Sequence, residues 1–287
     1  MAATSTTIAA TSTTTVAPRR SQPARWHLYV AAVAISLFIL IPIYLIAVAA
    51  FTPRAVLNGF PKPLVPVAVS TDTMQAFLAS RGVGQSVINS VLVGIMTLVL
   101  STALGAPAGY ALARFAFRGR DSFQLLILMT RAFPIAILAV PLTVTFINWN
   151  LYDTLWAVAL VHTALALPTT VLITASIFVA VPVDLEEAAL TLGCTPVGAF
   201  TRVALPLALP GVAAASIFTF VLSWNEVFAS VILTVQNRTL PAQVLTQLDN
   251  SPLPYKFAGG FALIVPALIF IFFIRRYLFN MWGRVVR

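Results

Sequence analysis

The sequence EEAALTLGCTPVGAFTRVALPLALP, residues 186–210, is a short polar interruption between two long apolar stretches. It begins with Glu186 and Glu187, which follow Pro182 closely. Carboxylates in the first turn of a helix are stabilised by the positive end of its dipole, and proline is favoured at a helix start. Gly193 predicts the end of this helix, because glycine adopts the left-handed conformation that closes a helix at little cost. We therefore expect a helix with an acidic start here.

A second short helix is predicted from Pro196 to about Val203, before Leu205 and Pro206 open the next apolar stretch. The two helices together form a predicted loop, residues 182–205, with apolar and polar faces. Such a pair of short helices can lie along a membrane surface and dock into a groove on a soluble partner. This loop is the most informative part of the chain for function.

Composition identifies the class of protein. Of 287 residues, 60% are hydrophobic and only 9% are charged, whereas soluble domains have roughly 25% charged residues. Apolar stretches near the ~20 residues that span a bilayer occur six times. The predicted spans are residues 28–51, 86–113, 123–148, 154–180, 206–235 and 257–279. Each must be helical, because a backbone buried in lipid has to satisfy its own hydrogen bonds. The sequence thus predicts an all-α, polytopic membrane protein.

The polar segments leave no room for a soluble domain of ordinary size. Residues 1–25 are rich in Thr, Ala and Ser and are expected to form a disordered cytoplasmic tail. Residues 26–287 then form one transmembrane domain, in which the longest connections are residues 52–85 and 236–256. Any large soluble machinery must belong to another chain.

Basic residues are distributed unequally between the two sides of the membrane. Eleven of them lie in the termini and in the connections after spans two and four, against five on the opposite side. The positive-inside bias therefore places both termini and the loop 182–205 in the cytoplasm. This topology and anionic lipid account for the net charge of +9, so no nucleic-acid partner is expected.

The sequence predicts no catalytic residue, no metal site and no cofactor in this chain. Cys194 is the only cysteine, which excludes an intrachain disulfide and a thiol metal cluster. A nucleotide-binding P-loop needs Gly-Lys followed by Ser or Thr. The only lysines, Lys62 and Lys256, follow Pro61 and Tyr255. The chain is therefore not an ATPase by itself.

The loop resembles a known family. Its spacing is Glu187-Ala188-Ala189, three residues, Gly193, nine residues, Val203, one residue, then Leu205-Pro206. This resembles the EAA loop of bacterial importer-type ATP-binding-cassette permeases, and residues 182–205 are called the EAA loop below. Four further motifs resemble the carbohydrate-uptake branch: Asn89-Ser90, Ala108–Arg114 with Phe117–Arg120, Asp153-Thr154 and Ser223–Glu226. The similarity runs from about residue 28 to 280 and is closest to the smaller, six-span permease of maltose-type systems.

The resemblance implies a sugar or polyol importer in the cytoplasmic membrane of a bacterium. Its partners would be a second permease, two copies of a cytoplasmic ATPase that binds ATP and Mg, and an extracytoplasmic substrate-binding protein. In the family, the acidic residue that opens the EAA helix contacts a basic residue of the ATPase, a role that maps onto Glu187. The predicted ATPase-coupling residues are Glu186, Glu187, Ala188, Ala189, Gly193, Val203 and Pro206.

Polar and aromatic residues inside the spans are candidates for the translocation path. A lone intramembrane carboxylate is costly, so Glu226 is expected to face protein, water or a partner. The predicted path residues are Arg131, His162, Trp224, Asn225 and Glu226. Hydrogen bonding and packing between helices, and snorkelling of Arg131 to the interface, are the alternatives.

By the same resemblance, the connection 236–256 would reach the binding protein. Its candidate contact residues are Gln236, Asn237, Arg238, Asp249 and Asn250. The alternative is an ordinary connector between two spans.

Three other functions are compatible with six spans. The first is an ATP-driven importer of another solute class, which the motifs in spans two, four and five disfavour. The second is a stand-alone ion-coupled carrier, for which an internal repeat and paired intramembrane charges are typical, and the sequence shows sparse charges and no convincing repeat. The third is a scaffold or receptor subunit without a pore.

Overall fold

The computed structural model describes residues 26–248 and 251–282, and of Leu248 and residues 273–282 it describes the backbone alone. The predicted tail 1–25 and the predicted contact residues Asp249 and Asn250 lie outside the described residues. Within this range the chain forms helices and no strand, which confirms the all-α fold class.

The described part of the chain divides into two compact units, with the boundary between Tyr44 and Leu45. The boundary falls inside α1 (Trp26–Ala50), whose side chains from Trp26 to Pro42 are exposed and mostly apolar. The second unit contains α2 (Arg54–Asn58), α3 (Asp72–Leu78), α4 (Val83–Arg114), α5 (Arg120–Met129), η1 (Thr130–Ala132), α6 (Ile135–Asn148), α7 (Leu155–Val179), α8 (Val183–Thr191), α9 (Pro196–Ala199), η2 (Phe200–Ala204), α10 (Leu205–Asn225), α11 (Phe228–Leu233), α12 (Leu240–Leu248) and α13 (Leu253–Trp282).

Among the described residues, five helices are long and apolar enough to cross a membrane. They are α1, α4, α7, α13 and the helix formed by α9, η2 and α10 together. A sixth candidate consists of α5 with η1 and α6, which are bent by 84° where they meet. The six predicted spans are thus all represented by helical segments, and two of them, residues 123–148 and 206–235, are interrupted.

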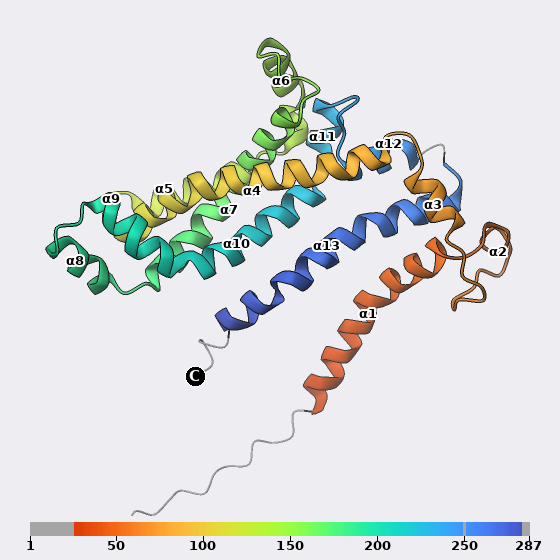
Figure 1. Cartoon of the computed structure of the whole chain (residues 1–287), viewed down its shortest axis with the longest axis horizontal. Coiled ribbons are helices and arrows are strands. Elements are labelled where there is room, and N and C mark those ends of the chain that lie inside the picture. Colours follow the sequence, from red (N-terminus) through yellow and green to blue (C-terminus); the bar gives the residue numbers. More distant parts are fainter. Residues whose placement is uncertain (1–25, 249–250, 283–287) are drawn as a thin grey trace, which may run out of the picture. The chain divides into compact units, whose positions relative to one another are not determined.

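The second unit is built around α4, α7 and α10, which pack along one another (Figure 1). The closest approach is between α4 and α7. A Cβ atom added at Gly109 would lie 2.7 Å from the amide nitrogen of Ala175 and 2.8 Å from the carbonyl oxygen of Val171. One turn earlier, Thr174 Oγ1 donates to the carbonyl oxygen of Gly105 over 3.0 Å. Gly105 and Gly109 form a GxxxG motif, which lets membrane helices pack backbone to backbone.

Polar side chains also join the helices of this bundle. Thr170 on α7 bonds Thr219 on α10 (3.1 Å between the hydroxyl oxygens), and Thr102 on α4 bonds Ser216 on α10 (3.1 Å). Lipid tails compete poorly for such groups, so hydrogen bonds of this kind fix which faces of the helices meet.

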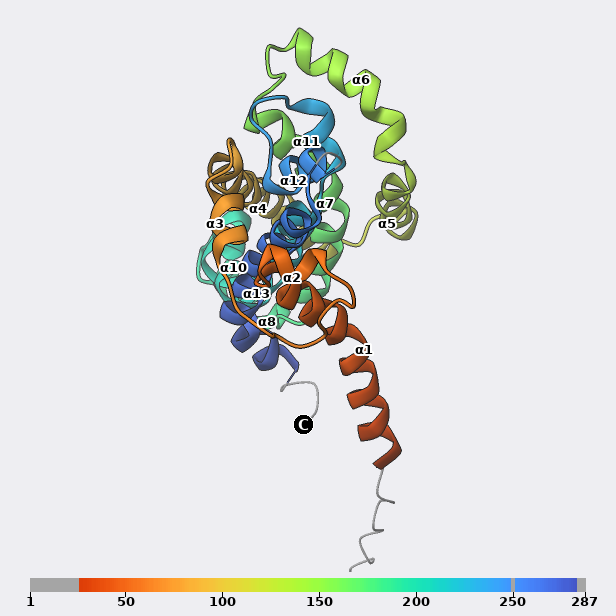
Figure 2. The same ribbon diagram turned by 90° about the vertical axis from the view of Figure 1, so that its right-hand side faces the viewer.

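The predicted span over residues 123–148 is not one continuous helix. Helical structure stops at Phe133, whose backbone is extended (φ −75°, ψ 115°), and α6 begins after Pro134. A residue before proline is disfavoured in the helical conformation, and proline cannot donate a helix hydrogen bond. Figures 1 and 2 both show α6 turning away from α5 and lying beside α11.

The predicted fifth span, residues 206–235, is likewise not one continuous helix. The helix α10 ends at Asn225, Glu226 is extended (φ −78°, ψ 119°), and the short helix α11 follows. The side chain of Glu226 accepts hydrogen bonds from the backbone amides of Phe228 (2.9 Å) and Ala229 (3.1 Å). A carboxylate that satisfies the free amides at the start of a helix favours a new helix over continuation of the old one.

The second helix of the EAA loop does not stop before Pro206. Residues 200–204 form a π-helical turn that joins α9 to α10 without interruption. Pro206 lacks an amide donor, and its ring would clash with the carbonyl group of Arg202 in a regular α-helix. The wider π-helical turn relieves this conflict and keeps the helix continuous.

The contact between α4 and α7 predicts opposite effects for one substitution at two positions of α4. Glycine to alanine in an open helical position stabilises by about 0.5 to 1 kcal/mol. Gly84→Ala meets no atom within 4 Å and should raise the thermal unfolding midpoint slightly. Gly109→Ala should lower it, because the new methyl group displaces α7. Equal midpoints for the two variants in the same detergent or lipid would show that the close approach is unimportant.

Candidate functional site

The first helix of the EAA loop forms as the sequence predicts. The helix α8 starts directly after Pro182, with Asp184 and Glu186 in its first turn. It ends at Thr191, and Gly193, two residues further on, has a left-handed backbone (φ 91°). The amide of Cys194 bonds the carbonyl of Ala189 and the amide of Gly193 bonds the carbonyl of Leu190, both over 3.0 Å. This is the Schellman arrangement that closes helices, and it explains the need for glycine at position 193.

The next helix begins with its own cap. The hydroxyl oxygen of Thr195 accepts a hydrogen bond from the amide of Gly198 (3.1 Å), and Pro196 occupies the first turn. Only one residue, Cys194, separates Gly193 from this cap. The two helices of the EAA loop are therefore connected by a tight, well-defined turn.

The residues of the EAA motif divide into two sets by exposure. Glu186 and Ala189 are buried, whereas Glu187 and Ala188 are exposed. This follows from the helical repeat, since residues three apart share one face. The exposed face of α8 also carries the apolar side chain of Leu185 (46% exposed), and Leu192 (87% exposed) follows directly after the helix. An acidic residue, a small residue and exposed leucines thus share the outward surface of α8.

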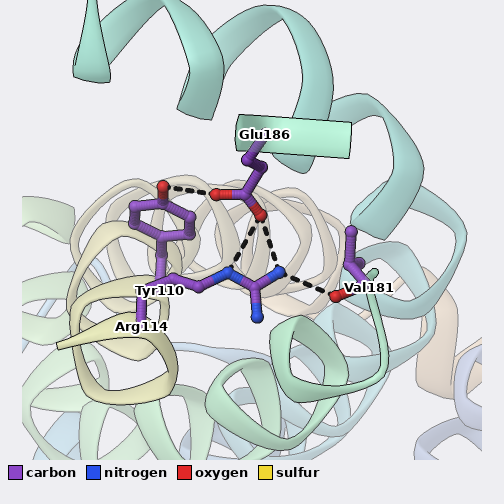
Figure 3. A network of polar contacts seen from close by, with 4 residues as sticks. All are labelled: Tyr110, Arg114, Val181 and Glu186. Atoms are coloured by element: carbon purple, nitrogen blue, oxygen red, sulfur yellow. Dashed lines mark hydrogen bonds and ion pairs between the residues drawn. The ribbon is translucent and has the colours of Figure 1, made fainter. Parts of the chain in front are cut away.

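The inward face of α8 is fixed to α4 by a buried carboxylate (Figure 3). Glu186 Oε1 accepts hydrogen bonds from Arg114 Nε (2.9 Å) and Nη2 (2.6 Å), and Glu186 Oε2 accepts one from the Tyr110 hydroxyl (2.7 Å). Arg114 Nη2 also donates to the carbonyl oxygen of Val181 (2.8 Å), just before α8. The side chains of Arg114 and Glu186 are 9% and 7% exposed. Both oxygens of this carboxylate are thus occupied within the chain.

Tyr110 and Arg114 reach Glu186 together because they lie four residues apart, on one face of α4. The ring of Tyr110 is held by aromatic neighbours. Its centroid lies 5.4 Å from that of Phe178 on α7 and 4.6 Å from that of Phe200 in η2. Removing one partner of a buried ion pair typically costs about 3 to 5 kcal/mol, because the other charge is left unpaired.

Two further residues of the predicted coupling set lie in the second helix of the loop. Val203 is half-buried in the π-helical turn, and Pro206 is exposed in the first turn of α10. Both residues lie where the loop continues into the span α10, and neither belongs to α8.

Three of the five predicted path residues line adjoining cavities. A cavity of about 580 Å³ has Arg131, Glu226 and Trp149 among its lining residues. A second one, of about 270 Å³, shares Arg131 and includes Asn225. Arg131 lies just before the break at Phe133, and Asn225 and Glu226 lie where α10 ends. The two helix ends therefore bring these three residues to adjoining cavities.

The other two predicted path residues lie inside the bundle. His162 and Trp224 are buried and do not line either cavity. His162 Nδ1 lies 2.8 Å from Ser223 Oγ, and Trp224 Nε1 donates to the carbonyl oxygen of Leu263 (3.1 Å). In this structure both join α10 to neighbouring helices.

The connection after α11 is held by Asp153, at the opposite end of α7 from the EAA loop. Asp153 Oδ1 accepts hydrogen bonds from the amides of Val235 (2.8 Å), Gln236 (3.0 Å) and Asn237 (3.1 Å). Asp153 itself has a left-handed backbone (φ 57°). Gln236 and Asn237 keep their side chains exposed. Sequence reasoning noted Asp153 only as part of a motif, because nothing local indicates its partners 82 residues away.

The motif Asn89-Ser90 holds the same connection from α4. Asn89 Nδ2 donates to the carbonyl oxygen of Arg238 (3.1 Å), and Ser90 Oγ accepts from the amide of Leu240 (2.7 Å). The backbone from residue 235 to 240 is therefore fixed by side chains from two distant parts of the chain.

The carboxyl group of Asp153 is held ionised by this arrangement. Burial by itself raises the pKa of Asp153, but the backbone amides of Asn237, Val235 and Gln236, together with the nearby Arg238 charge, lower it below its usual value. A carboxyl group with a lowered pKa contributes stability above its unfolded pKa of about 3.9 and loses it as the pH falls through the folded pKa.

Asp153→Ala should therefore release the connection 235–237. We expect faster hydrogen exchange of these three amides. Asp121→Ala, the same change at an exposed carboxylate in the first turn of α5, should leave their exchange unchanged. In the wild type, protection of these amides should persist from pH 7 down to pH 4, because the folded pKa lies below the usual value. Loss of protection already near pH 5 would contradict the assignment.

Comparison with the sequences of known proteins identifies the family of this chain. The family model described as "binding-protein-dependent transport system inner membrane component" matches residues 105–281. The trehalose transport system permease protein SugB of Mycobacterium tuberculosis is 30% identical over 219 residues, which cover 74% of this chain and 80% of SugB. The arabinooligosaccharides transport system permease protein AraQ of Halalkalibacterium halodurans is 32% identical over 260 residues, 88% of this chain and 92% of AraQ.

A solved structure has the same fold. One chain of a bacterial ABC transporter involved in the import of the acidic polysaccharide alginate matches with a TM-score of 0.70, over 91% of this chain and 99% of that chain, at 22% identity. The family match covers both the EAA loop and the cavities described above. This chain therefore belongs to the family of inner membrane components of binding-protein-dependent transport systems.

Proposed function

We propose that this chain is the permease subunit of an ATP-driven importer for a sugar or polyol. The relatives named above are permease proteins of systems for trehalose and arabinooligosaccharides. A third, NgcG of Streptomyces coelicolor, belongs to a diacetylchitobiose uptake system and is 35% identical over 193 residues. Their substrates share a chemistry, a sugar ring with many hydroxyl groups. The chain forms half of the translocation path, and a second permease forms the other half.

The outward face of α8 is the observation that carries this proposal. Glu187 and Ala188 are exposed there, beside Leu185 and Leu192. Glu187 contacts a basic residue of a cytoplasmic ATPase, the small Ala188 lets the two surfaces approach, and the leucines fill an apolar groove. ATP and Mg bind to two ATPase subunits. Their closure on ATP shifts the EAA loop and exchanges inward- and outward-facing arrangements of the spans.

The cavities that share Arg131 form this subunit's part of the path. Asn225, Glu226 and Arg131 supply polar groups for sugar hydroxyls, and Trp149 supplies an aromatic face. Sites for small molecules commonly combine an apolar lining with a few polar groups of this kind.

On the opposite side, the connection 236–256 meets an extracytoplasmic binding protein. Gln236, Asn237 and Arg238 lie on the part of the backbone that Asp153 and Asn89 hold in place, and Asp249 and Asn250 complete the proposed contact set. Both termini lie in the cytoplasm, as the basic residues predict.

Purification and reconstitution test the assignment. The tagged chain should copurify with a second permease and an ATPase, and vesicles containing the complex should take up sugar only with ATP and a loaded binding protein. Uptake by the purified chain alone, driven by an ion gradient, would instead make it a stand-alone carrier.

Glu187→Lys tests the docking surface. It places a positive charge opposite the proposed basic partner, so copurification of the ATPase and sugar uptake should both fall by about tenfold or more. Both should fall less in Glu187→Gln, which removes the negative charge without adding a positive one. Membrane insertion and the fold should be unaffected, because Glu187 is exposed. Asp121→Lys is the matched control, since it makes the same change of charge on an exposed residue of α5. Equal ATPase recovery for Glu187→Lys and Asp121→Lys would refute the docking role.

A further inference from the structure

Glu186 and Glu187 are adjacent acidic residues with opposite surroundings. Glu187 is exposed, whereas Glu186 is 5% exposed and accepts three hydrogen bonds from Arg114 and Tyr110. Within the described residues, this is the one ion pair between side chains. A partner protein that docks on the outward face of α8 can contact Glu187 but finds both oxygens of Glu186 already occupied. The two carboxylates therefore have different tasks.

The contacts of Glu186 join helices that are far apart in the sequence. Arg114 and Tyr110 are at the C-terminal end of α4, 72 and 76 residues before Glu186. The backbone connections of α8 are the short turn at residues 180–182 and the left-handed turn at Gly193. Neither turn joins α8 to α4 through the backbone, although Arg114 Nη2 of α4 donates to the carbonyl oxygen of Val181 in the first turn. The direct polar connection between them is the buried carboxylate.

This connection resists displacement of α8 relative to α4. Separating Glu186 from Arg114 leaves two charges in a region from which water is largely excluded, and such a charge is costly without its partner. Arg114 is further held by the carbonyl of Val181, and Tyr110 by Phe178 and Phe200. A movement of α8 thus carries the end of α4 along more easily than it breaks the contact. Because α4 packs on α7 at Gly105 and Gly109, a displacement of α4 would also act on α7.

We propose that Glu186 is a positioning residue that transmits displacement of α8 to α4 through Arg114 and Tyr110, while Glu187 alone meets the ATPase. This inference rests on the proposed function, since it concerns how ATPase movement reaches the spans. It assigns coupling to the inward face of α8 and docking to the outward face.

The experiment uses the complete importer in vesicles, and it measures ATP hydrolysis and sugar uptake with and without loaded binding protein. Glu186→Gln keeps the outward face of α8, so the ATPase should still copurify at the wild-type level. Uptake per ATP hydrolysed should fall by roughly tenfold, within the 5- to 150-fold range typical of coupling between sites. Tyr110→Phe removes one hydrogen bond of the contact and should give a smaller loss of coupling.

Two double variants separate coupling from stability. Exchanging the partners, Glu186→Arg with Arg114→Glu, restores an ion pair and should recover much of the lost uptake per ATP. Replacing both by apolar residues, Glu186→Leu with Arg114→Met, should preserve the fold and the complex, because apolar packing substitutes well for a buried ion pair. Sugar uptake per ATP hydrolysed should nevertheless stay low in this apolar variant. Normal uptake per ATP in this apolar variant would overturn the proposal.

A distance measurement avoids any change to the contact itself. Spin labels at Leu104 on α4 and Leu190 on α8, both exposed, can be attached to cysteines introduced at these positions in a Cys194→Ala background. Their separation should be the same in nucleotide-free and ATP-bound complexes, because the two helices move together. A changed separation would refute the proposal even if all variants failed to assemble. By contrast, a wild-type complex without ATP-dependent sugar uptake would refute the proposed function itself.

Discussion

The close contact between α4 and α7 is the constraint on which the rest of this structure depends. In a membrane, apolar side chains gain little by leaving lipid for protein, so helices associate through backbone approach and interhelical hydrogen bonds. Gly105 and Gly109 allow that approach, and Thr174 uses it to reach the carbonyl of Gly105. With these two helices fixed, α10 packs against both. The EAA loop and the turn at Asp153 then lie at opposite ends of α7.

The EAA loop is organised by the helical repeat. One short helix presents Glu187 and Ala188 outward and Glu186 and Ala189 inward. A motif of adjacent residues can therefore serve two surfaces at once. A similar arrangement occurs at the other end of α7. There Asp153 accepts hydrogen bonds from the backbone amides of residues 235–237, and the side chains of Gln236 and Asn237 are exposed. In both places a carboxylate, buried at Glu186 and half-buried at Asp153, accepts hydrogen bonds that order a segment with exposed side chains.

Much of this fold could be predicted from the sequence, because span lengths, the acidic start of α8 and the turn at Gly193 are local signals. The breaks at Phe133 and Glu226 were missed. A hydropathy pattern averages over many residues, whereas one proline or one capping carboxylate decides where a helix ends. The difference in burial between Glu186 and Glu187 could not be predicted either. It depends on Tyr110 and Arg114, more than 70 positions earlier, and only the packing of α4 on α7 brings them there. The GxxxG pair in α4 was a readable signal that was not used.

The uninterrupted helix from Pro196 to Asn225 has a mechanical consequence of its own. It contains 30 residues, and at 1.5 Å per residue it is about 45 Å long. It begins at the cap formed by Thr195 and ends where Asn225 and Glu226 border the cavities. A rotation of this helix about its axis, applied at its first turn, would therefore change the orientation of Asn225 toward the cavity at its far end.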